Sequence, residues 1–372
     1  MIGEMTAAQA ARESAPAPLS LFPVRTVWTL ALNNQLTVPP VYSGLHAYFA
    51  IEGDRLVAYE LERGRQEWIA PARADLEPAV GDGLIFIAHA ASLTALRTKD
   101  GSLAWQLPAL GELSVPPVWD NGWLVLATRT GDILALRAID GHLIWRRDLG
   151  SSAHARPSLA ADRVYVPADD GRIVALRVDT GDVAWEHRLG GPATGLLAQD
   201  DRLYAGSNDN YFYALRSDDG RLAWRWRTGA DVVGVPVLDD RNVYFVSLDN
   251  ALRALSRKTG VQQWIRLLPI RPTRGPTRVD STLVVSGIAP ALRGYNMKDG
   301  TAAGDLPAAG EQAGSPYAVP AASTTLPQLL VVTRDIAKGA TATLFMRNLD
   351  PPLGPFTPPT NGTKVTLLTE GP

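Results

Sequence analysis

The stretch Ile173-Val174-Ala175-Leu176-Arg177-Val178-Asp179-Thr180-Gly181-Asp182-Val183-Ala184-Trp185 decides the fold of this chain. It starts with an apolar run, passes through a Thr-Gly pair and ends on a tryptophan four residues after the glycine. A Thr-Gly pair between apolar runs indicates a hairpin turn, because glycine takes positive φ without steric cost and threonine bonds to the local backbone. The stretch therefore predicts two antiparallel strands joined by a tight turn.

The same pattern recurs along most of the chain, with one tryptophan about every 40 residues. From the second copy onward, each tryptophan stands four residues after a glycine, which usually follows Asp or Thr. A further copy carries Gly300 but has Gly304 in place of the tryptophan. A period of this length indicates a solenoid or a propeller. The repeated tryptophans are Trp28, Trp68, Trp105, Trp145, Trp185, Trp224 and Trp264.

Each repeat contains enough strand signals for a four-stranded antiparallel sheet. In one repeat, a short run at Pro117-Val118 is followed by Trp123–Leu126 and Ile133–Leu136, and then by the turn and its tryptophan. A sheet of this size cannot bury both faces alone, so neighbouring sheets must stack. A tryptophan at one fixed place in each repeat suits the gap between two sheets. We therefore interpret the seven tryptophans as structural anchors.

The ends of the chain predict how the ring closes. Strand-like runs at Leu329–Thr333 and Thr343–Arg347 supply most of an eighth blade, while Val24–Leu30 carries Trp28 with no blade of its own before it. Pairing these segments completes the ring and removes free sheet edges. We therefore predict an all-β, eight-bladed β-propeller of four-stranded antiparallel blades, closed by its N- and C-terminal strands.

The composition at both ends sets the expected domain boundaries. Residues 1–20 are rich in Ala, Pro and Ser without an apolar core, so we expect a disordered lead. Residues 21–350 form the propeller, and residues 351–372 form a Pro-rich flexible tail.

Charge and cysteine content exclude several classes of function. Lys and Arg number 36 and Asp and Glu number 38, so the net charge of −2 provides no general field to attract nucleic acid. The chain has no cysteine, which excludes disulfides, thiolate metal sites and cysteine nucleophiles. No run approaches the roughly 18 apolar residues that indicate a transmembrane helix. We expect a monomer within a protein complex.

The sequence contains no recognisable catalytic, cofactor-binding or metal-binding motif. It lacks a Gly-x-Ser-x-Gly elbow, a phosphate-binding glycine loop and a His-Glu-x-x-His pair. The histidines fall at different points of the repeat and show no ligand spacing. We therefore predict no catalytic residue, no cofactor, no metal and no enzymatic activity. The histidines are His46, His89, His142, His154 and His187.

Two sets of residues remain as candidates for binding. The loop from Arg266 to Arg278 has four arginines and no acid, and exposed apolar residues beside arginine are typical of protein interfaces. A solvated loop that proline keeps rigid is the competing interpretation. The partner-binding candidates in this loop are Leu267, Leu268, Ile270, Arg271 and Arg274. The residues that we expect to open each innermost strand, at the channel mouth, are Val38, Glu77, Val115, Arg156, Thr194, Gly234, Arg274 and Ser315.

The repeat, an apolar strand ending in Ala-Leu, a Thr-Gly or Asp-Gly turn and then Trp, resembles the repeat of pyrroloquinoline-quinone (PQQ) type propellers. Within that superfamily the chain is most similar to the BamB family. The resemblance implies eight blades, no bound quinone and docking on the periplasmic part of a BamA-like protein. After Ala-Leu the family often has Asp where this chain has Arg97, Arg137, Arg177 and Arg216. We expect these arginines to pair with the turn acids Asp100, Asp140, Asp179 and Asp218.

Three functions are open at this point. The leading one is a non-catalytic scaffold that supports assembly of outer-membrane β-barrel proteins, in the periplasm or another extracytoplasmic space. Membrane association would then need a signal or anchor that this sequence does not contain. The second is a PQQ-dependent dehydrogenase, for which Arg156 and Arg274 are the available cations. Such enzymes commonly carry a disulfide of adjacent cysteines, which this chain cannot form. The third is an interaction or sensor module of another extracytoplasmic complex.

Overall fold

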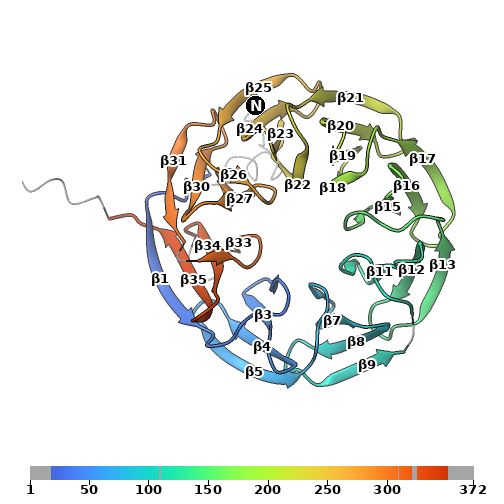
Figure 1. The fold of residues 1–372 in the computed structure, drawn as a ribbon, viewed down its shortest axis with the longest axis horizontal. Coiled ribbons are helices and arrows are strands. Elements are labelled where there is room, and N and C mark those ends of the chain that lie inside the picture. The colour runs from blue at the N-terminus through green and yellow to red at the C-terminus, as the bar shows by residue number, and fades with distance from the viewer. Residues whose placement is uncertain (1–17, 109, 309, 321–324, 351–372) are drawn as a thin grey trace, which may run out of the picture.

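The computed structural model describes residues 18–108, 110–308, 310–320 and 325–350. Eight blades of antiparallel strands surround a central axis, which confirms the predicted eight-bladed β-propeller (Figure 1). In each blade the first strand lies nearest the axis and the last lies on the rim (Figure 1). The described ranges contain no helix with the length and hydrophobicity that a membrane span requires.

The first six blades each contain four consecutive strands of the chain. The first three blades are formed by β2 (Val41–Ser43), β3 (His46–Ile51), β4 (Arg55–Glu60) and β5 (Arg65–Pro71), by β6 (Ala79–Gly81), β7 (Leu84–His89), β8 (Ser92–Arg97) and β9 (Leu103–Leu107), and by β10 (Val118–Asp120), β11 (Trp123–Ala127), β12 (Asp132–Arg137) and β13 (Leu143–Asp148). The next three are formed by β14 (Ser158–Ala160), β15 (Arg163–Pro167), β16 (Arg172–Arg177) and β17 (Val183–Arg188), by β18 (Ala193–Gln199), β19 (Arg202–Ser207), β20 (Tyr211–Arg216) and β21 (Leu222–Arg227), and by β22 (Val232–Leu238), β23 (Asn242–Ser247), β24 (Ala251–Ser256) and β25 (Gln262–Leu267).

The last two blades carry additional short strands. Blade seven is formed by β27 (Thr277–Val279), β28 (Thr282–Val285), β30 (Ala291–Asn296) and β31 (Ala302–Pro307), and a separate two-stranded sheet joins β26 (Arg271–Pro272) to β29 (Gly287–Ile288). Blade eight is formed by β33 (Tyr317–Val319), β34 (Gln328–Asp335), β35 (Gly339–Arg347) and β1 (Val24–Ala31), and β32 (Glu311–Gln312) also pairs with β34.

The two ends of the propeller are joined in blade eight. β1 lies antiparallel to β35, with Val24 opposite Arg347 and Ala31 opposite Thr341. The N-terminal strand therefore forms the rim of a blade whose other strands come from the C-terminal end, as Figure 1 shows. The predicted closure by Val24–Leu30 is confirmed.

Buried apolar side chains fill the spaces between blades. The described residues form eight core clusters, one at each junction between neighbouring blades. Strands β3, β7, β11, β15, β19 and β23 are buried on both faces, since each is covered by a blade on either side. The stability of the ring is therefore distributed over these junctions.

The repeated tryptophan and glycine contact each other across a junction between two blades. The ring of Trp145 lies against Gly181 of the next blade, where an added Cβ would be 2.6 Å from the ring. Gly181 has φ of +72°, so both its backbone conformation and the close contact require glycine. The Trp145 indole N–H also donates a hydrogen bond of 2.7 Å to the Val178 carbonyl of that blade. The other six repeated tryptophans donate in the same way, at 2.8 to 3.1 Å, to Leu61, Thr98, Ala138, Ser217, Arg257 and Met297.

In blade seven, the place of the repeated tryptophan is taken by a phenylalanine from the N-terminal segment. Gly304 stands where the other repeats have tryptophan, and the ring of Phe22 occupies the space beside it. An added Cβ would be 2.3 Å from this ring at Gly304 and 2.1 Å from it at Gly294. Phe22 is buried in the cluster between blades seven and eight, among residues such as Leu306 and Phe345. A residue remote in sequence thus replaces the missing tryptophan.

The segment that carries Phe22 is hydrogen-bonded to blade seven. The Leu19 amide donates to Asp280 Oδ2 at 2.8 Å, and the Leu21 amide donates to Thr282 Oγ1 at 2.9 Å. Leu19 and Ser20 fall within the expected lead of residues 1–20, so the boundary expected at residue 20 lies too far along the chain. The rest of that lead, residues 1–17, and the expected tail at residues 351–372 lie outside the described residues.

Replacing Phe22 by alanine should destabilise the propeller, because it removes the ring that packs against Gly294 and Gly304 and leaves a cavity there. We expect the free energy of unfolding to fall by about 3–5 kcal/mol, measured by urea denaturation. Leu19→Ala is the matched control, since Leu19 lies in the same segment but is 37% exposed. Equal effects of the two variants would contradict the assigned role of Phe22.

Deleting residues 1–30 should remove most of β1 together with Phe22 and leave β35 as a free edge. We expect a marked fall in the melting temperature and aggregation on heating, followed by circular dichroism and light scattering. A truncated chain that melts like the full chain would show that β1 is not needed for closure.

Candidate functional site

The loop after β25 contains β26, which pairs with β29 in the segment that follows β28 of blade seven. β26 pairs with β29, with Arg271 opposite Ile288 and Pro272 opposite Gly287. An added Cβ at Gly287 would lie 2.3 Å from the Arg271 carbonyl oxygen, so glycine permits this close pairing. We call this pair of strands the β26–β29 ribbon.

Burial divides the predicted partner-binding residues into two groups. Leu267 is 79% exposed and Arg271 is also exposed, whereas Leu268 and Ile270 are 6% and 5% exposed. Leu268 and Ile270 belong to the core cluster between blades six and seven. The expectation that these two residues lie exposed on the loop is therefore corrected: their side chains hold the loop onto the propeller. Ile288, which the sequence did not single out, is 74% exposed on the neighbouring strand.

The four arginines of the loop also differ in their bonding. Arg266 Nε donates to the Gly300 carbonyl at 2.7 Å, and Arg278 Nη1 donates to the Leu238 carbonyl at 2.6 Å. Arg271 and Arg274 have no hydrogen-bond or ion-pair partner among the described residues. Two of the four guanidinium groups are therefore used within the fold, and two are available to a ligand.

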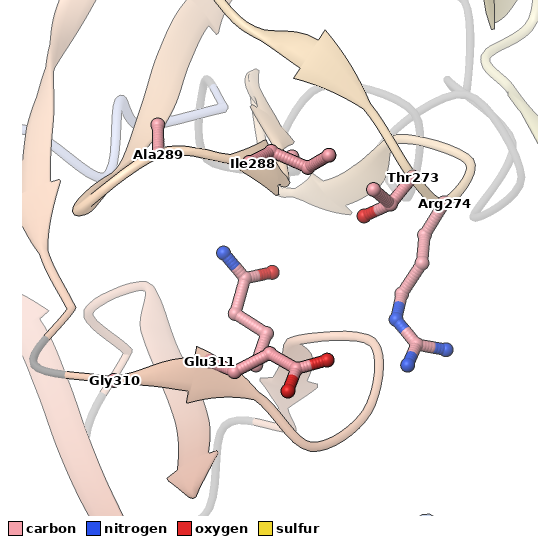
Figure 2. Close-up of a pocket in the computed structure, with 8 residues that line it drawn as sticks. Thr273, Arg274, Ile288, Ala289, Gly310 and Glu311 are labelled. Atoms are coloured by element: carbon pink, nitrogen blue, oxygen red, sulfur yellow. The ribbon is translucent and has the colours of Figure 1, made fainter. Parts of the chain in front are cut away.

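A cavity of about 540 Å³ lies beside the β26–β29 ribbon. Thr273, Arg274, Gly287, Ile288 and Ala289 line one side, and Gly310, Glu311 and Gln312 line the other. Figure 2 shows Arg274 and Glu311 extending toward each other from opposite walls. Of these lining residues the sequence predicted Arg274 alone, because the other walls come from segments that meet only in the folded ring.

The residues expected at the channel mouth include one ion pair. Arg156 Nη2 lies 3.1 Å from Glu77 Oε1. Glu77 precedes blade two and Arg156 precedes blade four, so this ion pair links two blades that are not neighbours. The guanidinium of Arg156 is therefore already in an ion pair, whereas that of Arg274 has no ion-pair partner among the described residues. Near this mouth the Tyr42 ring stacks on Tyr317 with centroids 4.5 Å apart. Burial of the Tyr42 hydroxyl raises its pKa well above the usual range.

Three histidines contact single carboxylates. His89 Nδ1 lies 3.0 Å from Asp75, His154 Nδ1 lies 2.6 Å from Asp169, and His46 Nε2 lies 3.5 Å from Glu67. Within the described ranges, no three His, Cys, Asp or Glu side chains are grouped so that they could hold a metal ion. Each of these contacts therefore joins one histidine to one carboxylate.

The arginines after Ala-Leu contact the turns that follow them. Arg137 Nη2 is 2.5 Å from Asp140, Arg216 Nη2 is 2.5 Å from Asp218, and Arg177 Nε is 3.5 Å from Asp179. The Arg137 guanidinium lowers the pKa of Asp140 to about 2. Arg97 departs from the expectation, since it donates to the Leu103 carbonyl and to Ser102 Oγ in place of Asp100. These exposed contacts contribute little to stability.

Comparison with solved structures shows the same fold in proteins of different kinds. BamB from Moraxella catarrhalis superimposes with a TM-score of 0.69 and 19% identity, over 87% of this chain and 99% of that chain. The quinohemoprotein alcohol dehydrogenase from Comamonas testosteroni gives 0.69 and 12%, over 87% and 76%. The computationally designed protein Ika8 gives 0.68 and 12%, over 85% and 97%. At these identities the likeness is one of fold alone.

Comparison of sequences is more specific. The outer membrane protein assembly factor BamB of Nitrosomonas eutropha is 30% identical over 117 residues, which are 30% of this chain and 28% of that protein. The aligned part thus spans less than a third of that relative's length. A sequence model for the family described as outer membrane protein assembly factor BamB matches residues 24–116, 109–200 and 189–326. Because these segments together cover most of the chain, this protein belongs to the BamB family of PQQ-like repeat propellers.

Proposed function

We propose that this chain is a non-catalytic scaffold that supports assembly of outer-membrane β-barrel proteins by docking a BamA-like protein partner. The observation that carries the proposal is the family match, which extends over residues 24–326 and so includes seven complete blades. The N. eutropha relative is named as an assembly factor and supports the same role. We place the chain in the periplasm, as one copy within a larger complex.

We propose that the partner docks where the end of β25 in blade six meets the exposed part of blade seven. The docking surface consists of Leu267, Arg271, Arg274 and Ile288. Its two exposed apolar side chains and two unpaired guanidinium groups provide the combination of apolar anchor and arginine that is common at interface hot spots. Leu268 and Ile270 fix the loop from beneath, since both are buried. The surface is therefore held in place before a partner arrives, which lowers the entropic cost of binding.

Replacing Leu267 and Arg271 together by alanine should weaken the complex with the periplasmic part of the BamA-like protein from the same organism. Truncation of a central anchor often costs about 2 kcal/mol or more, so we expect the dissociation constant to rise at least about tenfold. Isothermal titration calorimetry with purified components measures this change.

The matched control is the double variant Leu222→Ala and Arg227→Ala, which removes an exposed leucine and an exposed arginine from the rim of blade five. We expect its affinity to equal that of the unchanged chain. Unchanged affinity of the Leu267/Arg271 variant would exclude this docking surface. If the unchanged chain does not bind the BamA-like protein at all, an interaction or sensor role in another extracytoplasmic complex is favoured.

A quinone-dependent dehydrogenase is the second candidate, because the fold is shared with the C. testosteroni enzyme. Two features of this chain argue for the scaffold. Without cysteine it cannot form the disulfide common in such enzymes, and the Arg156 guanidinium at the channel mouth is already paired with Glu77.

Incubation with PQQ and calcium should therefore leave the melting temperature unchanged and produce no dye-linked oxidation of alcohols or sugars. Differential scanning fluorimetry and a dye-reduction assay measure the two quantities. Saturable micromolar binding of PQQ together with substrate-dependent dye reduction would favour the dehydrogenase.

A further inference from the structure

The cavity beside the β26–β29 ribbon combines three kinds of wall in one space of about 540 Å³. Arg274 provides a cation, and Ile288 and Ala289 provide apolar surface (Figure 2). Gln312 also lines the cavity and provides an amide. Its volume lies within the range of about 300–1,000 Å³ that is usual for ligand sites. The cavity is therefore large enough for one residue of a polypeptide together with its backbone.

The charge of the cavity favours an anion. Both oxygens of Glu311 accept hydrogen bonds from Arg334, at 2.9 and 3.1 Å. The Arg334 guanidinium lowers the pKa of Glu311, so that carboxylate stays ionised and paired. Arg274 has no hydrogen-bond or ion-pair partner among the described residues, although its charge also acts on Glu311 across the cavity and lowers the pKa of that carboxyl. Because Glu311 is already paired with Arg334, these three groups together carry one excess positive charge. A guanidinium group binds a carboxylate well because its two parallel N–H donors match the two oxygens.

The amide of Gln312 favours a ligand that also carries an N–H group. Its Oε1 atom is buried and accepts no hydrogen bond within the described part of the chain. A buried acceptor without a donor is costly, so a ligand N–H that reaches it would gain a hydrogen bond and remove that cost. Ile288 is 74% exposed in the free chain and would be covered by an apolar group of the same ligand.

We propose that this cavity binds the C-terminal residue of a partner polypeptide, with an apolar side chain. In such a residue the carboxylate, the amide N–H and the side chain all branch from one Cα atom. They can therefore reach Arg274, Gln312 and Ile288 at the same time. An internal Asp or Glu uses its side chain as the carboxylate and has no apolar group left for Ile288. The inference deepens the proposed function and rests on it, because Arg274 and Ile288 also belong to the docking surface.

Two peptides that differ in one group test the proposal on the intact chain. Acetyl-Ala-Ala-Leu with a free carboxylate should bind with a dissociation constant below about 1 mM, measured by isothermal titration calorimetry. Its C-terminal amide should bind at least about tenfold more weakly, because the charge-assisted hydrogen bonds to Arg274 are lost. A third peptide, acetyl-Ala-Asp-Leu-amide, carries an internal carboxylate and should also bind at least about tenfold more weakly. Equal binding of the acid and either amide would overturn the proposal.

Variants of the chain identify the groups involved. Arg274→Gln and Gln312→Leu should each weaken binding of the free acid at least about fivefold, while their melting temperatures stay equal to that of the unchanged chain. Arg271→Gln is the matched control, since Arg271 is an exposed, unpaired arginine of the same loop that does not line the cavity. Unchanged binding by Arg274→Gln would overturn the proposal. Because these measurements use no BamA-like protein, their failure is distinguishable from failure of the docking role, which the Leu267/Arg271 variant tests.

Discussion

The contact between a tryptophan in one blade and a glycine turn in the next is the constraint on which this propeller depends. The indole ring needs a surface without a Cβ atom, and the turn needs positive φ, so glycine satisfies both at Gly181. The indole N–H then bonds to a carbonyl of the same neighbouring blade. Seven of the eight junctions therefore combine apolar burial with a directional bond, and the regular spacing of the motif repeats this geometry around the ring.

The one junction that lacks the motif shows how strict this constraint is. Gly304 leaves a space between blades seven and eight, and Phe22 fills it from a segment that is bonded to Asp280 and Thr282. The same segment leads directly into β1, which closes blade eight. Closure of the ring and completion of its incomplete junction are thus performed by one stretch of chain. The N-terminal segment is part of the core of the propeller.

The candidate binding surface lies at the junctions of blade seven with its neighbours, where β26 pairs with β29 and β32 pairs with β34. A cavity is lined there by residues of β29 and β32 and by Thr273 and Arg274, which follow β26. Leu267 and Ile288 are 79% and 74% exposed there, more than exposed apolar residues of the regular blades such as Leu103 at 55% and Leu222 at 45%. Two arginines with no partner in the described chain accompany them.

The sequence by itself determined the all-β class, the eight blades and the closure by Val24–Leu30, because a period of tryptophan and glycine reports a contact that every repeat must make. It did not separate Leu267 from Leu268 and Ile270, since three apolar residues in one loop look alike until the neighbouring blade buries two of them. The ring of Phe22 beside Gly304 and the cavity between Arg274 and Gln312 were decided only by the tertiary structure. Both unite residues far apart in the chain, and neither leaves a periodic signal in the sequence.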